Sequence, residues 1–195
     1  MLNWEFWFGG SITQGFSPLS LECELKSGPV YQLTMQATGG PKCPFSDFVW
    51  KNRAPPRVQF FAWLMVLQRL NCRANLKHKH LLDVATCELC GHGDEDCDHL
   101  FLFCPFAAQV WSKLGMDVQN CEVQTIWTVP HPATIPARHF DSFLLLVCWN
   151  IWKHRNEVVF RNLPPSHERL WCACKDEARD WSYRWRAADL PVNDS

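Results

Sequence analysis

The sequence has few tyrosines, with 2 among its 195 residues, and it lacks a long hydrophobic run. Its longest apolar stretch, Phe143 to Trp152, is interrupted by Asn150 and falls short of the roughly 20 residues that span a bilayer. The first ten residues have neither a basic start nor a continuous apolar segment, so a secretory leader is not expected. We therefore expect an intracellular protein, nuclear or cytoplasmic and not secreted, with no membrane partner.

The chain is rich in 11 Trp, 13 Phe, 13 Pro and 11 Cys. Hydrophobic residues make up 47% and charged residues 20%, which is the balance of an ordinary globular protein. Because the cysteine number is odd and no leader is expected, a secreted disulfide framework is disfavoured. In a reducing compartment, clustered cysteines indicate metal or redox chemistry, and isolated ones are small buried hydrophobic residues.

Charge is divided unevenly along the chain, although the net charge is only -1. Residues 51–80 carry seven Lys and Arg and no acid, whereas residues 81–104 carry six Asp and Glu and no base. A basic stretch of this kind can bind phosphates. The alternative is that the two stretches neutralise each other within the fold.

Periodicity and turn signals predict an all-α fold, with the first long helix starting after Pro55-Pro56. Asn75 is the expected cap of a short second helix, and Pro164-Pro165 is expected to end the fourth. Ser166 is expected to cap the last helix. The expected helices are 57–70, 76–82, 106–114, 140–160 and a final one after residue 166. The first helix has apolar side chains over more than half its circumference, which predicts that it is buried rather than a surface amphipath.

These signals predict a small helical domain, a C-terminal helical pair and an irregular N-terminal segment, and the cysteines clustered within residues 87–104 predict that the small domain is zinc-bound. Glycine and proline turns dominate the start of the chain, where only a short strand at 31–35 is expected. The predicted boundaries are 1–44 for a weakly ordered N-terminal segment, 45–115 for the zinc-binding domain, 116–137 for a linker, 138–188 for the C-terminal helices and 189–195 for a tail.

Four of the cysteines, Cys87, Cys90, Cys97 and Cys104, fall within residues 87–104. Cys87 and Cys90 form a C-x2-C pair followed by glycines, which lets two thiolates bind one Zn²⁺ across a tight turn. His99 and Cys104 would complete a Cys3His tetrahedron. Such a closed set is structural and not catalytic. His92 and Cys97 are competing ligands, and a redox dithiol is disfavoured because no strand is visible before Cys87.

The spacing of His99 and Cys104 raises a geometric problem. Five residues on a regular α-helix turn a side chain by about 500°, which leaves the two about 140° apart. Pro105 disfavours helical geometry at the residue before it, so Cys104 is expected to leave the short 98–103 turn and swing back to the metal.

Five segments follow one another in a distinctive order: 48–51 (FVWK), 54–64 (APPRVQFFAWL), 69–76 (RLNCRANL), 87–90 (CELC) and 99–105 (HLFLFCP). Over roughly residues 45 to 112 they resemble one family, the reverse-transcriptase zinc-binding domain of plant LINE-type (non-LTR) retrotransposons. The later segment 148–156 (CWNIWKHRN) resembles the linker that follows this domain in such elements. The resemblance implies that Cys87, Cys90, His99 and Cys104 are the metal ligands.

The resemblance and the charge pattern together predict a non-catalytic module with one Zn²⁺ and RNA or DNA as the partner. No Asp-Asp pair of the polymerase type occurs, no catalytic residue is expected, and neither polymerase nor RNase H domain nor small-molecule substrate is expected. The alternative is a structural or protein-interaction module that binds no nucleic acid. The acidic residues near the ligands would repel phosphate, so the expected contacts lie on the basic stretch, at Arg53, Arg57, Arg69, Arg73, Lys77 and Lys79.

Overall fold

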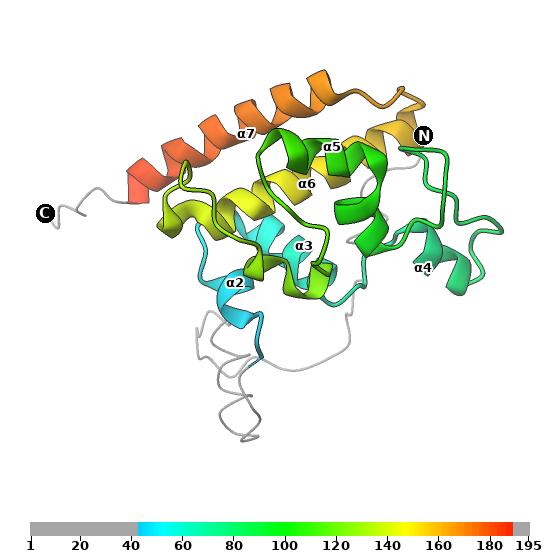
Figure 1. Cartoon of the computed structure of the whole chain (residues 1–195), viewed down its shortest axis with the longest axis horizontal. Coiled ribbons are helices and arrows are strands. Elements are labelled where there is room, and N and C mark those ends of the chain that lie inside the picture. The colour runs from blue at the N-terminus through cyan, green and yellow to red at the C-terminus, as the bar shows by residue number, and fades with distance from the viewer. Residues whose placement is uncertain (1–42, 189–195) are drawn as a thin grey trace, which may run out of the picture. The chain divides into compact units, whose positions relative to one another are not determined.

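The computed structural model describes residues 43–188, and their side chains as far as residue 182. This part of the chain is helical (Figure 1), which confirms the predicted all-α class, and it contains no strand, only an isolated bridge between Thr86 and Asp94. The expected strand at 31–35, the tail 189–195 and nearly all of the N-terminal segment lie outside the described residues. The elements are α2 (Ser46–Trp50), α3 (Pro56–Val66), α4 (Arg73–His78), the π-helix η2 (His99–Phe103), α5 (Pro105–Lys113), the 3-10 helix η3 (Val123–Thr128), α6 (Ala137–Arg161) and α7 (His167–Ala188).

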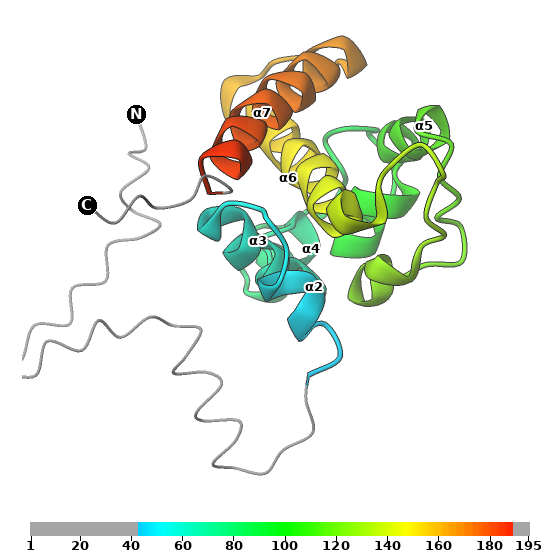
Figure 2. The ribbon, with the colours of Figure 1, turned by 90° about the vertical axis from the view of Figure 1, so that its left-hand side faces the viewer.

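Helix α6 is the element on which the others pack. It contacts α3, α7 and η2, and Figure 2 shows it passing between α7 and the helices nearer the start of the chain. Leu144, Leu145 and Ile151 of α6 are fully buried. Phe61 of α3 packs edge-on against Trp149 of α6, with ring centroids 5.1 Å apart. No helix in the described part of the chain is long and apolar enough to cross a membrane.

Helix α3 begins at Pro56, as the proline pair predicts, but it ends at Val66, four residues before the predicted end. Gln68 takes a left-handed backbone with φ of 53°, which stops the helix. The prediction that α3 is buried is only half right. Val58 and Met65 face the core, while Phe60 on the opposite side is 45% exposed and contacts the ring of Trp63.

The short helix α4 corrects a second prediction. It covers Arg73–His78, so Asn75 lies inside the helix and does not cap it. The Asn75 amide instead donates to the backbone carbonyls of Gln68 and Leu70, at 2.8 and 2.6 Å. Asparagine side chains often bond to nearby backbone in this way. Asn75 therefore fastens α4 to the turn that follows α3.

The C-terminal helices lie close to the predicted ranges: α6 begins three residues before the expected start and ends one residue after the expected end, and α7 begins directly after Ser166. Asn162, with φ of 52°, ends α6 two residues before the proline pair that was predicted to end it. Ser166 does cap α7, because its Oγ accepts the N–H of Arg169 at 3.3 Å.

The segment 116–137, predicted as a linker, contains the short helix η3. Val123 and Ile126 of η3 are fully buried. The Val123 N–H donates to the Asp98 carboxylate at 2.7 Å, and Trp127 packs on Phe48 of α2 at 5.5 Å between ring centroids. These contacts connect α2, η3 and the residues just before η2.

Candidate metal centre and basic surface

Four side chains converge between the end of α4 and the start of α5. One donor atom from each of Cys87, Cys90, His99 and Cys104 lies within 4.8 Å of the others. The Sγ atoms of Cys87 and Cys104 are 3.9 Å apart, and Cys90 Sγ is 3.4 Å from His99 Nε2. A tetrahedron with metal–sulfur arms of 2.3 Å has edges of about 3.8 Å. The cluster therefore has the size and the donors of a closed four-ligand metal site.

A tight loop presents the first two cysteines. The Gly91 N–H donates to the Cys87 carbonyl at 2.8 Å, and the Cys87 N–H donates to the Gly93 carbonyl at 3.0 Å. Gly91 and Gly93 have φ of 72° and 67°, a conformation that side chains with a Cβ rarely adopt. The loop also aims the His92 N–H at Cys90 Sγ, 3.4 Å away.

The second pair of side chains is presented by η2. Its π-helical turn is closed by the Cys104 N–H, which donates to the His99 carbonyl five residues earlier at 2.5 Å. Cys104 has ψ of 131°, which confirms the prediction that it leaves helical geometry before Pro105. The sequence did not reveal the wider π-helical turn of η2. This turn brings His99 and Cys104 to the same side of the helix.

The two competing ligands lie outside this cluster. His92 is exposed, and its Nδ1 is 2.6 Å from the Cys90 carbonyl. Cys97 is buried against Cys72, with a sulfur–sulfur distance of 3.6 Å. In the described part of the chain, the four sequence-predicted ligands are the group that comes together.

The Cys87 and Cys104 thiols share a proton in the absence of metal. A hydrogen bond from Cys87 lowers the pKa of Cys104, and the backbone N–H groups of Phe106 and Ala107 lower it further against the opposing effect of burial. The same bond and burial raise the pKa of Cys87. The Cys104 thiolate at the start of α5 is therefore more stable than that of Cys87, and metal binding would release the thiol protons.

A buried ion pair lies next to the metal loop, and sequence analysis missed it. Glu95 is fully buried, and the Arg155 guanidinium of α6 donates to it at 2.6 to 3.2 Å. From the sequence, Glu95 is one of the six acidic residues of 81–104 near the ligands, and nothing there indicates a partner on a distant helix. No short-range pattern links two residues 60 positions apart.

The six predicted phosphate-binding residues fall into two groups. Arg53 and Arg57 lie at the start of α3, and the others lie beyond its far end, about 15 Å away along the helix axis. Arg57 is within 3.7 Å of Glu177, and Arg73 pairs with Glu88 at 2.7 Å. The group beyond α3 consists of Arg69, Arg73, Lys77 and Lys79, and we call it the α4 basic group.

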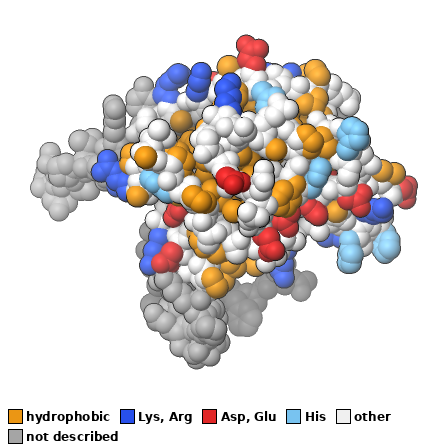
Figure 3. Space-filling view, viewed as in Figure 1, with side chains coloured by type: hydrophobic (Ala, Val, Ile, Leu, Met, Phe, Trp, Pro, Cys, Tyr) orange, Lys and Arg blue, Asp and Glu red, His pale blue; other side chains and the backbone are white. Residues whose placement is uncertain are grey.

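Exposure differs within the α4 basic group. Arg69, Lys77 and Lys79 are exposed, whereas the Arg73 side chain is only 17% exposed. Figure 3 shows basic, histidine and acidic side chains close together on the side where α4 projects. The electrostatic potential on this side is therefore mixed. Because Arg69, Lys77 and Lys79 are exposed, they are the members of the α4 basic group that a phosphate from solvent could reach.

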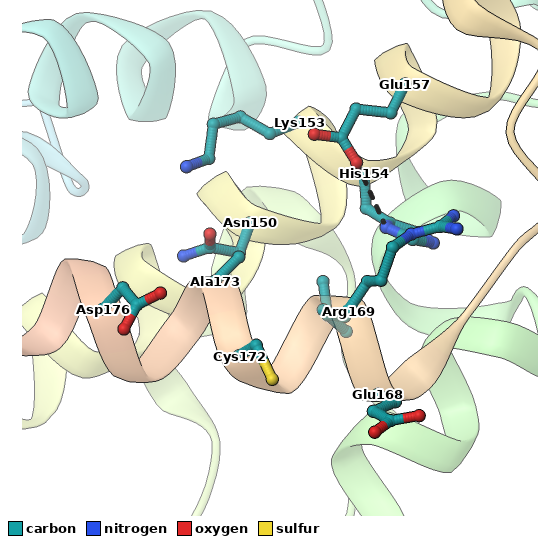
Figure 4. Close-up of a pocket in the computed structure, with 10 residues that line it drawn as sticks. Asn150, Lys153, His154, Glu157, Glu168, Arg169, Cys172, Ala173 and Asp176 are labelled. Atoms are coloured by element: carbon teal, nitrogen blue, oxygen red, sulfur yellow. Dashed lines mark ion pairs between the residues drawn. The ribbon is translucent and has the colours of Figure 1, made fainter.

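A groove of about 410 Å³ lies between α6 and α7 (Figure 4). His154 lines it, and its Nε2 accepts the Ser166 N–H at 3.0 Å while its Nδ1 faces Glu157 at 3.9 Å. Burial lowers the pKa of His154, the nearby Arg169 lowers it further, and Glu157 opposes both. A neutral imidazole in these contacts fixes the start of α7 to α6.

Comparison with known proteins agrees with this geometry. Residues 26–111 match the model of a family described as zinc-binding in reverse transcriptase. A 70-residue segment is 30% identical to the "Putative ribonuclease H protein" of Arabidopsis thaliana, covering 36% of this chain and 11% of that relative. The chain thus spans about a tenth of the curated relative it matches. No solved structure matches.

All four converging side chains lie within the matched range, as do α3, α4 and η2. The order of motifs, the Cys3His cluster and the family match point to the same assignment. Residues 26–111 therefore match the zinc-binding domain family of reverse transcriptases both in sequence and in the placement of the four converging side chains.

Proposed function

We propose that this chain is a non-catalytic, zinc-stabilised nucleic-acid-binding module derived from the reverse transcriptase of a LINE-type retrotransposon. Zinc is the metal that the donor set favours, because three thiolates and one imidazole at tetrahedral spacing suit Zn²⁺ better than hard cations such as Mg²⁺. Four protein ligands leave no open position for a substrate, which supports a structural role for the ion.

The metal assignment is tested by the zinc content of the purified chain. We expect one zinc per chain, lost in Cys87→Ser and in Cys104→Ser and retained in Cys97→Ser, because Cys97 Sγ faces Cys72 and not the cluster. Cys121→Ser, a half-buried thiol outside the cluster, is the matched control. If zinc is retained in Cys104→Ser and lost in Cys97→Ser, the proposed ligand set is wrong and Cys97 takes the place of Cys104.

The nucleic-acid part of the proposal depends on the exposed cations of the α4 basic group. Residues 51–80 contain no acid, and Arg69, Lys77 and Lys79 remain exposed when the chain is folded. Lys79 Nζ is held by the Asn71 side-chain oxygen at 3.0 Å, and Asn75 ties α4 to the turn that contains Arg69. The three charges are therefore held on one structural unit beside the metal loop.

The test is the salt dependence of binding to labelled single-stranded RNA, single-stranded DNA and duplex DNA, measured by fluorescence anisotropy. Each phosphate contact contributes about 0.7 to 0.9 to the slope of log K against log salt. The triple variant Arg69→Gln, Lys77→Gln, Lys79→Gln should therefore lower affinity and reduce the slope by about 2.

The matched control removes the same charge elsewhere. Arg138, Arg161 and Lys175 are exposed and lie on α6 and α7, far along the chain from α4. Their replacement by Gln should leave the slope nearly unchanged. An equal loss in both triple variants would mean that only net charge matters, and the α4 basic group would have no special role.

One observation favours the alternative of a structural or protein-interaction module. Basic and acidic residues pair within the fold, at Arg73 with Glu88, Arg57 with Glu177 and Arg155 with Glu95. In that case zinc would serve stability alone. The anisotropy experiment separates the two functions, because the alternative predicts no salt-dependent binding of the unmodified chain.

A further inference from the structure

Glu95 holds the start of α4 from a distant part of the chain. The N-cap position of α4 is Cys72, which makes no side-chain cap bond. Instead, Glu95 Oε1 accepts the N–H of Arg73 at 3.0 Å, and the Glu95 carbonyl accepts the N–H of Ala74 at 3.0 Å. A helix start leaves four such N–H groups without intrahelical partners. One residue of the metal loop thus satisfies two of the four.

The position of Glu95 follows from the metal loop itself. It lies between Cys90 and His99, and its N–H donates to the Ala85 carbonyl at 2.8 Å. The Thr86–Asp94 bridge and the Cys87–Gly93 hydrogen bond continue this pairing of residues 85–87 with 93–95. A metal at the four-ligand cluster would therefore hold the segment that carries Glu95 at both ends.

Arg155 supplies the charge that lets Glu95 be buried. It lies on α6, is 2% exposed, and donates to both carboxylate oxygens. A buried carboxylate without a partner is strongly destabilising. Glu95 therefore connects the metal loop, α4 and the central helix α6.

We propose that Glu95 is a positioning residue, through which metal binding sets the position and order of α4 and of its cations Arg73, Lys77 and Lys79. The nucleic-acid half of this inference rests on the proposed function, whereas the coupling of metal to α4 does not. Coupling of two sites is reciprocal. Metal should raise the affinity for nucleic acid, and nucleic acid should raise the affinity for metal by the same factor.

The first experiment measures hydrogen exchange of the full chain, loaded with zinc and after zinc removal by a chelator. We expect the α4 amides, starting with Arg73 and Ala74, to exchange about tenfold faster or more without zinc. The α6 amides around Leu144 to Ile151 should lose less protection than the α4 amides. Unchanged exchange in α4 would overturn the inference, and so would an equal loss in α4 and α6, because zinc would then support the whole fold without acting on α4.

The second experiment compares two double variants that both remove the buried ion pair. Replacing both charges by neutral side chains avoids an unpaired buried charge, so both variants are expected to fold. Glu95→Gln with Arg155→Met keeps an oxygen that can accept the Arg73 N–H, whereas Glu95→Met with Arg155→Met does not. With zinc bound in both, only the Met variant should show the fast α4 exchange of the zinc-free chain. Equal exchange in the two variants would show that Glu95 does not act by capping α4.

Affinity for single-stranded RNA and DNA, compared at one salt concentration, gives the third readout. The Glu95→Met, Arg155→Met variant should bind about fivefold or more weakly than its Gln counterpart, although the two have the same charge. Equal affinities would refute the link from Glu95 to the basic group. If the unmodified chain binds neither oligonucleotide, the proposed function fails, while hydrogen exchange still decides whether metal and α4 are coupled.

Discussion

The cysteines of this chain are distinguished by what each sulfur faces. Cys148 is fully enclosed, and burial raises the pKa of its thiol far above the usual range. Burial, with the charge of Glu177 nearby, raises the pKa of Cys174 to about 12. These thiols stay neutral and pack as small hydrophobic groups. Cys87, Cys90 and Cys104 instead gather with His99 in the group of the described residues that could hold a metal ion.

The buried His154 makes one part of stability depend on pH. Its pKa is lowered in the fold, mainly by burial, so between that lowered value and its ordinary value near 6.5 the unfolded chain binds a proton that the fold does not. Stability therefore falls as pH decreases through this window. Protonation at Nε2 would also break the hydrogen bond from Ser166.

The measurement is the free energy of unfolding in urea between pH 7.5 and 5.5 at constant zinc. His154→Gln should show a shallower loss of stability on acidification than the unmodified chain, because glutamine does not titrate. His78→Gln, which alters an exposed histidine of α4, should behave like the unmodified chain. A slope that is the same in all three proteins would assign the pH dependence to other groups.

At the scale of elements, the sequence predicted the starts of α3 and α7 and missed the end of α3 and both bounds of α4. Pro56 and Ser166 act through local rules that a reader of the sequence can apply, and the structure follows both. The ends at Gln68 and Asn162 depend on single residues that adopt positive φ. Asparagine tolerates this conformation and Pro164 follows Asn162, whereas no comparable signal marks Gln68. The shift of α4 has a tertiary cause, because its cap is Glu95, about twenty residues downstream.

The metal cluster was predictable because its ligands are close in sequence and of distinctive type. The four side chains that converge are those that spacing favoured and the resemblance implied, and the departure of Cys104 from the helix followed from Pro105. The π-helical turn of η2 was not predictable, because it depends on how the core packs Leu100 and Phe101 and not on a local sequence signal. The convergence of the four side chains was thus predictable, but the backbone that joins them was not.

At the scale of the whole described unit, the metal cluster shares one core with the C-terminal helices. Leu100, Phe101 and Leu102 of η2 are buried, and Phe101 packs against Phe61 of α3 with ring centroids 5.9 Å apart. The Trp111 indole N–H of α5 donates to the Phe101 carbonyl at 2.6 Å. A metal bound by the cluster would therefore add directly to the stability of the folded chain.

Because the metal cluster and the helices share one core, we expect the melting temperature of the chain to rise with the concentration of free zinc. A ligand that binds only the folded state adds about 1.4 kcal/mol of stability for each tenfold rise in its free concentration above Kd. For a chain of this size that corresponds to about 3 to 5 °C in Tm. Calorimetry in zinc buffers should show this rise for the unmodified chain and for Cys121→Ser. Cys104→Ser should melt at a lower temperature that no longer depends on zinc. A zinc-independent Tm in the unmodified chain would show that the four side chains converge without binding the ion.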